Sequence, residues 1–256
     1  MAVSVKSPPE IAAMRRAGRV VGKVLQTLAN SIQAGMRTRE LDLIAERELK
    51  ALGAVSSFKG YRGYPSSLCV SINDEVVHGI PGERIIKNGD LVSLDFGAIV
   101  DGYHGDAALT VTVGEVGMRA QNLLRTTKGA LEAGVAAARV GAHLGDISCA
   151  IQEYAESHGF SVVREYTGHG IGKAMHEDPL VPNFGRAGTG LELKAGMTFA
   201  LEPMLTAGDW HTKVGTDNWV VFTADHSLAA HFEHTIALAA TGAEVLTIPE
   251  NGPTGG

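Results

Sequence analysis

One segment of the sequence constrains the fold more than any other: SLDFGAIVDGYHGDAALTV, residues 93–111. At its centre lies Asp101-Gly102, a dipeptide strongly favoured in two-residue hairpin turns because both turn positions need a left-handed backbone. Apolar runs typical of buried strands flank this dipeptide, and each run carries one aspartate, Asp95 or Asp106. The sequence therefore predicts an antiparallel hairpin that holds two carboxylates in a largely apolar setting.

The predicted hairpin register brings these carboxylates close together. With the turn at residues 101–102, Asp95 faces Ala108. Asp106 faces Gly97, so both aspartates lie on one face of the hairpin as diagonal neighbours, and we expect Gly97 to leave open space between them. Buried carboxylates repel each other unless something positive lies between them. Taken alone, the segment leaves three interpretations: exposed loop aspartates, a proton-sharing acid–base pair, or a metal site.

Further ligand-type residues at strand spacing favour the metal site. Glu202 follows the apolar run 197–201, and Glu233 lies in the strand-like segment 231–238. His169 is flanked by glycines, which allow close backbone approach. The carboxylates carry about four negative charges, which two divalent ions would balance. Oxygen ligands with one imidazole suit Mn, Fe, Co or catalytic Zn rather than a closed structural zinc site.

The composition argues against several other functional classes. The chain has 256 residues and a formal net charge of -6, which provides no basic footprint for nucleic acid. Its cysteines, Cys69 and Cys149, form no disulfide framework or cysteine-type metal site, which fits a reducing compartment. The sequence shows no signal-peptide pattern and no apolar run long enough to span a membrane. We therefore expect a cytoplasmic location.

The predicted elements follow one order twice: two helices and then a block of strands. The expected helices cover residues 8–35, 38–53, 119–139 and 144–158, and the strand blocks cover 55–113 and 160–248. Ser7 and Glu10 predict a capping box at the first helix.

Fragments of sequence similarity match this repeated order. Residues 87–95 resemble 194–202, which pairs Asp95 with Glu202, and a second match pairs His78 with His176. We interpret the chain as one α+β domain, residues 1–248, whose pseudo-equivalent halves (about 1–115 and 116–248) share a central cleft, followed by a flexible tail at 249–256.

The ligand-type residues also carry a family resemblance. In order along the chain, the set resembles the metal ligands of the pita-bread metallopeptidases, and within that group the type I methionine aminopeptidases in their short bacterial form. The spacing between Glu202 and Glu233 is too short for the helical insertion of type II members. The matching stretches cover nearly the whole chain: SINDEVVHGIP (71–81), the hairpin, GHGIG (168–172), HE (176–177), LEPM (201–204) and EHT (233–235).

The resemblance implies a fold and a ligand arrangement. The fold would be a pita-bread α+β fold with two pseudo-symmetric halves, a central antiparallel sheet and helices on its outer face. Asp95 would bind one metal ion, and His169 with Glu202 would bind the other. Asp106 and Glu233 would bridge the two ions.

Catalytic and binding roles follow from the same resemblance. Glu202 would carry protons, His176 would stabilise the oxyanion, and His78 would contact the nitrogen of the cleaved bond. Thr235 would donate a hydrogen bond to a metal ligand, and His231, on the strand face of Glu233, is a candidate cleft residue. The substrate methionine would occupy an apolar pocket formed by Phe58, Tyr61, Tyr64, Cys69, Met175 and Trp219.

The implied activity is removal of the initiator methionine from nascent proteins whose second residue is small. Nascent N-termini would be the partners, with the ribosome as a further contact; no nucleic acid or membrane is expected to bind, and we expect a monomer. Two alternatives stay open. One is a short Xaa-Pro peptidase of the same fold, and the other is a metal-free relative that only binds peptides and should have lost ligand residues.

Overall fold

The computed structural model describes residues 3–249, and its helices lie where the sequence predicts them. The predicted capping box is present at the first helix, where the backbone N–H of Ser7 donates to the Glu10 carboxylate at 2.8 Å. This helix stops short of the predicted Gly35 because Ile32 already has an extended backbone. Of the tail predicted at 249–256, residues 250–256 lie outside the described part. The helices are α1 (Pro8–Ser31), α2 (Thr38–Ala51), α3 (Met118–Ala137) and α4 (Leu144–Ser157), with a short 3-10 turn, η1 (Tyr61–Gly63).

A curved antiparallel sheet forms the centre of the molecule. In spatial order its main path contains β1 (Val55–Ser56), β4 (Leu91–Val100), β5 (Tyr103–Thr112), β14 (Glu233–Ala239), β9 (Thr198–Leu201), β7 (Gly168–Gly170) and β8 (Glu177–Val181). Two further strands join its sides, β2 (Cys69–Ile72) on β4 and β15 (Gly242–Val245) on β14.

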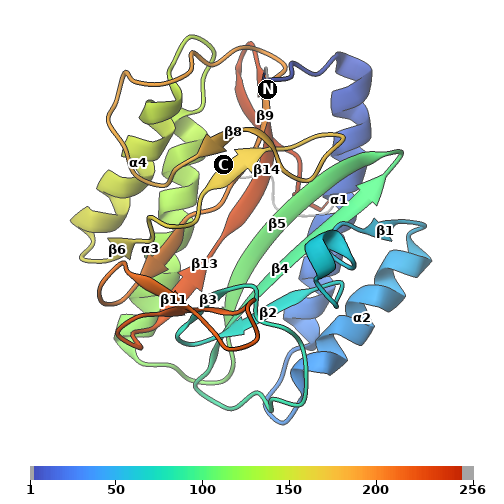
Figure 1. Ribbon diagram of the computed structural model, residues 1–256, viewed down its shortest axis with the longest axis vertical. Coiled ribbons are helices and arrows are strands. Elements are labelled where there is room, and N and C mark those ends of the chain that lie inside the picture. Colours follow the sequence, from blue (N-terminus) through green and yellow to red (C-terminus); the bar gives the residue numbers. More distant parts are fainter. Residues whose placement is uncertain (1–2, 250–256) are drawn as a thin grey trace.

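The middle of this sheet joins the two halves of the sequence. β5 from the first half pairs with β14 from the second, with Glu233 opposite Ala108. β4 flanks β5 on one side, and β9 flanks β14 on the other. The four strands on which we predicted carboxylate ligands are therefore adjacent (Figure 1).

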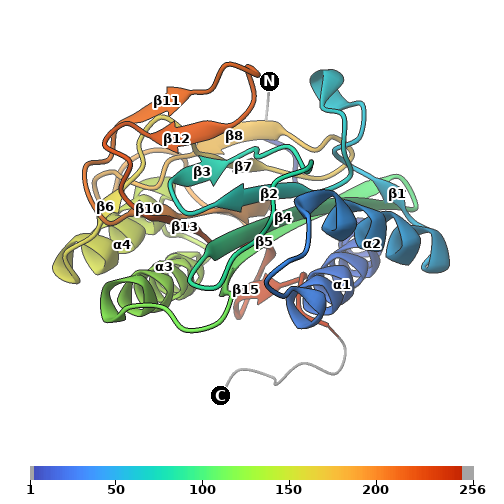
Figure 2. The ribbon, with the colours of Figure 1, turned by 90° about the horizontal axis from the view of Figure 1, so that it is seen from below.

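The helices cover one face of the sheet as two pairs (Figure 2). Leu41 of α2 and Phe96 of β4 belong to one buried cluster, which α1 also joins. Ile147 of α4 and Phe199 of β9 belong to another, which includes α3. Burying these apolar side chains contributes about 25 cal/mol per Å² of surface removed from water. The opposite face of the sheet is thus left for the site, and the predicted α+β class is confirmed.

Short strands form two further small sheets. One contains β11 (Thr212–Val214), β12 (Val221–Thr223) and β3 (Glu75–Val77). The other contains β13 (Ala229–His231), β10 (Met204–Thr206) and β6 (Ser161–Val162), and it packs in one buried cluster with α3 and α4. Figure 2 shows β3, β8, β11 and β12 on the side away from the helices. Within residues 3–249 no helix is both long enough and apolar enough to cross a bilayer.

Candidate active site

The hairpin has the predicted register. Asp95 pairs with Ala108 and Gly97 with Asp106 across β4 and β5. The turn residues Asp101 and Gly102 have φ angles of 51° and 77°, the left-handed backbone that an Asp-Gly hairpin turn requires. Local sequence therefore places both aspartates on one face of the sheet.

The expectation of open space at Gly97 is wrong. A Cβ atom at this position would lie 2.8 Å from both Phe58 Cε1 and Ser57 Cβ. The segment after β1 fills the space that glycine leaves, so Gly97 admits the aromatic ring of Phe58 rather than a cation.

Gly97→Ala is therefore expected to destabilise the protein by about 1–3 kcal/mol, the usual cost of overpacking a filled interior. The strand backbone is held by pairing on both sides, so the Phe58 ring must move. Urea unfolding measures the effect. Gly117→Ala is the matched control, because a Cβ there would meet no atom within 4 Å; equal stability of the two variants would contradict the packing argument.

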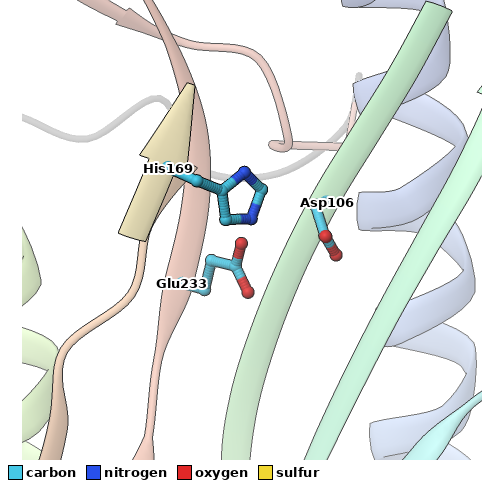
Figure 3. A group of neighbouring side chains, drawn as sticks. All are labelled: Asp106, His169 and Glu233. Carbon is cyan, nitrogen blue, oxygen red and sulfur yellow. The ribbon is translucent and has the colours of Figure 1, made fainter. Parts of the chain in front are cut away.

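The predicted metal ligands converge from four strands and one strand end. Ligand atoms of Asp106, His169 and Glu233 all lie within 4.8 Å of one another. Figure 3 shows the three side chains around one gap, contributed by β5, β7 and β14. His169 Nε2 lies 3.6 Å from Glu202 Oε1, just beyond the end of β9. Asp95 of β4 lines the same pocket.

The carboxylates are held in surroundings that disfavour their charge. Burial raises the pKa of Asp95 to about 7. Burial, together with the neighbouring carboxylates, raises the pKa values of Asp106, Glu202 and Glu233 well above their usual range. The ionised carboxylates are therefore disfavoured here unless a cation compensates their charge.

Unpaired atoms show that the residues fit such a cation. Asp95 Oδ1, Asp106 Oδ1 and Glu233 Oε1 are buried and have no hydrogen-bond partner among the described residues. Buried polar atoms are normally satisfied, so unpaired ones that converge need an explanation. Oxygen ligands with a single imidazole match a catalytic divalent-metal site.

The protonation and orientation of His169 suit a metal ligand. Burial lowers its pKa to about 4, which keeps the imidazole neutral. Nδ1 donates to the carbonyl of Gly170 at 2.8 Å, so the lone pair is on Nε2, the nitrogen nearer Glu202. This bond fixes the tautomer and the ring orientation.

An apolar pocket adjoins the metal-type ligands. The six side chains predicted to contact a methionine pack into one cluster with Ile80. Tyr64 and Trp219 meet edge to face, with ring centroids 5.0 Å apart. The Tyr64 hydroxyl donates to backbone carbonyls, so the pocket presents its apolar ring. The pocket lining combines this cluster with Arg62, His78, His176 and the five predicted ligands.

The two predicted catalytic histidines are held in different ways. His176 Nδ1 lies 2.9 Å from the Tyr61 hydroxyl, and the two rings stack. Desolvation, together with neighbours such as His169, lowers the pKa of the exposed His176 to about 3, and burial lowers that of His78 to about 4, which favours the neutral form of both. His78 has a φ of 62°, a strained backbone for a non-glycine residue, and such strain concentrates at functional sites.

Thr235 is hydrogen-bonded to the backbone of the predicted metal ligand Asp106 rather than to its carboxylate. Its hydroxyl donates to the backbone carbonyl of Asp106 at 2.8 Å and accepts from the Asp106 N–H at 2.9 Å. His231 lies behind Glu233 and is absent from the pocket lining. Sequence reasoning missed Arg62, an exposed cation over the Tyr61 ring at the pocket, although the glycines around Gly60-Tyr61-Arg62-Gly63 mark a loop able to carry it.

The curved sheet and its carboxylate–histidine centre, set beside an apolar pocket, define a metal-dependent enzyme. The sequence pattern of metallopeptidase family M24 matches residues 12–240. The chain therefore belongs to metallopeptidase family M24, and it binds divalent metal.

Individual relatives agree with this membership. Methionine aminopeptidase 1 of Bacillus subtilis (strain 168) is 50% identical over 242 residues, which make up 94% of this chain and 98% of the relative. The crystal structure of methionine aminopeptidase from Thermotoga maritima matches with a TM-score of 0.95 and 44% identity over 96% of this chain and 100% of that one. Prolidase from Pyrococcus furiosus matches at 0.79 and 23% identity, over 96% of this chain and 66% of its own, and shows the fold alone. The predicted pita-bread fold is confirmed.

Proposed function

We propose that this chain is a metalloaminopeptidase that removes an N-terminal methionine when the next residue is small. The observation that carries the proposal is a single pocket in which an apolar cluster of side-chain size adjoins a carboxylate-rich centre. The relative from Bacillus subtilis, at 50% identity, bears the name of that activity. Nascent polypeptide N-termini in the cytoplasm are the substrates this proposal implies, with a monomer acting near the ribosome.

The metal content belongs to the proposal as well. Two divalent ions, drawn from Mn, Fe, Co and Zn, would balance four buried carboxylates. Asp95 would hold one ion, His169 and Glu202 the other, and Asp106 with Glu233 would lie between them. When bound, such ions make water acidic enough to supply hydroxide near neutral pH and polarise a carbonyl.

The remaining steps fall to the chain's own residues. The cluster around Tyr64 and Trp219 would bind the methionine side chain and exclude water from it. Glu202 would accept a proton from the attacking water and pass it to the leaving amine. His176, neutral and held through Nδ1 by Tyr61, would donate from Nε2 to the developing oxyanion. His78 would contact the nitrogen of the cleaved bond.

One assay tests the activity against its nearest alternative. Metal-free protein is reloaded with Mn, Fe or Co and given Met-Ala-Ser and Ala-Pro peptides. We expect release of methionine from the first and no cleavage of the second. Cleavage before proline, with Met-Ala-Ser intact, would instead establish an Xaa-Pro peptidase; metal-dependent binding without turnover of either peptide would indicate a binding protein.

His176→Ala is expected to lower kcat on Met-Ala-Ser by about 10²–10³, the usual loss for one oxyanion donor. Tyr61→Phe keeps the stacked ring but removes the hydrogen bond at 2.9 Å, so it should cost less. Steady-state kinetics of both variants make the comparison. An unchanged kcat with only a raised KM for His176→Ala would assign this residue to binding rather than to the transition state.

A further inference from the structure

His231 is a buried side chain that the proposed mechanism does not use. It ends β13, two residues before Glu233, and is 1% exposed. Neither of its ring nitrogens has a hydrogen-bond partner among the described residues. Its Nε2 lies 3.8 Å from Glu233 Oε2. Burying an unpaired imidazole is costly, so its place directly behind a predicted metal ligand requires a reason.

The sheet gives His231 a position equivalent to that of a ligand. β5 and β14 pair antiparallel with Ala108 opposite Glu233, and a local twofold between these two residues exchanges Asp106 with His231. The same operation exchanges Thr110 with Thr235. His231, at the end of β13 and two residues before β14 begins, therefore occupies relative to Glu233 the place that Asp106 occupies relative to Ala108.

The hydrogen bonds of the two threonines follow the same local twofold symmetry. The Thr235 hydroxyl holds the backbone N–H and carbonyl of Asp106 at 2.9 and 2.8 Å. The Thr110 hydroxyl holds the backbone N–H and carbonyl of His231, both at 2.9 Å. Each threonine thus holds the backbone of one residue of the exchanged pair, Asp106 or His231. The anchoring of His231 is thus as specific as that of a ligand residue.

We propose that His231 is a positioning residue for the metal centre, with Nε2–H donating to Glu233 Oε2. This inference rests on the proposed function, in which Glu233 lies between the two ions. The present separation of 3.8 Å exceeds a hydrogen bond of about 2.7–3.2 Å by about 0.6–1.1 Å, which a small side-chain rotation covers. A neutral imidazole that donates to the carboxylate fixes the direction of its oxygens and so favours metal binding.

Paired substitutions separate hydrogen bonding from packing. His231→Leu replaces the imidazole with an apolar side chain of similar size that has no hydrogen-bond donor. His231→Gln retains an N–H donor. We measure Mn²⁺ affinity of each metal-free protein by titration calorimetry and the urea midpoint of each apoprotein. His231→Leu is expected to bind Mn²⁺ about 10–100-fold more weakly, with an apoprotein midpoint equal to or above that of the unchanged protein. His231→Gln should retain most of the affinity.

Two outcomes would overturn the proposal. One is unchanged Mn²⁺ affinity in His231→Leu. The other is an equal loss of affinity in the Leu and Gln variants, which would assign the effect to side-chain shape rather than to hydrogen bonding. If His231→Leu does not fold, His231→Met removes the donor with a more adaptable side chain. Failure of the proposed function appears separately, as an unchanged protein that leaves Met-Ala-Ser intact; the affinity series still decides the role of His231.

Discussion

Asp106→Asn is expected to abolish metal-dependent activity while the fold stays intact. Asparagine has nearly the same shape but carries no charge, and position 106 lies 4% exposed among other carboxylates. Loss of an outer partner of a metal typically costs about 10–100-fold in affinity or activity, so loss of a charged residue that we propose as a direct ligand should cost more. The backbone bonds from Thr235 do not involve the substituted group, so folding should survive.

Metal content, methionine release and circular dichroism together measure this effect. Asp101→Asn is the matched control, since Asp101 lies on the same hairpin but is exposed and pairs with Arg16. Retained metal and activity in Asp106→Asn would remove Asp106 from the ligand set. Lost activity in the control would show that the hairpin, rather than the carboxylate, is at fault.

In the metal-free protein Asp95 is expected to contribute stability that is lost as pH rises from about 4 to above 7, whereas histidines with lowered pKa values, such as His78 and His169, contribute in the opposite direction. The pKa of Asp95 is raised from 3.8 to about 7 by burial. Unfolded chains release this proton near 3.8, whereas the folded apoprotein keeps it until about 7, so the folded state binds more protons in between. The stabilisation is complete below the lower value and is lost as pH rises through the higher one. Asp95 alone accounts for roughly 4 kcal/mol.

Urea unfolding between pH 5 and 7.5, with chelator and then with added Mn²⁺, measures this dependence. Glu10 and Asp225 contribute little to the slope in this pH range. Hydrogen bonding lowers their pKa values to about 2, so both stay ionised in the folded protein throughout it. Metal at about 1,000 times its Kd should restore about 4 kcal/mol. The Asp95 contribution is the difference in pH slope between the unchanged apoprotein and Asp95→Asn, because the histidine contributions are common to both; equal slopes would contradict the account.

Local signals in the sequence predicted much of the architecture. Asp101-Gly102 set the hairpin register because few dipeptides adopt two consecutive left-handed residues. Ser7 and Glu10 marked the start of α1, and apolar periodicity located all four helices that the described residues contain. Carboxylates at strand spacing and a glycine-flanked histidine indicated the ligand-type residues, and the family resemblance added which of them would hold which ion.

Local sequence patterns did not predict some details of side-chain packing. The space at Gly97 is occupied by Phe58, which reaches it from a segment 39 residues earlier. Thr235 was expected to donate a hydrogen bond to a metal ligand, but the sequence did not indicate that the acceptor is the backbone carbonyl of Asp106. Both details concern side chains that meet across distant segments, where alternation along one strand gives the face but not the partner.

The chain's local chemistry is enough to specify its helices, its hairpin and the face on which Asp95 and Asp106 lie. Backbone preference and strand alternation act within a few residues, so both can be predicted from the local sequence. The pairing of β5 with β14 is different in kind, because it joins residues 125 positions apart, Ala108 and Glu233. That pairing depends on both halves burying their helices on the same face of one sheet. It alone brings His169, Glu202 and Glu233 to the hairpin aspartates, and it buries His231 behind them.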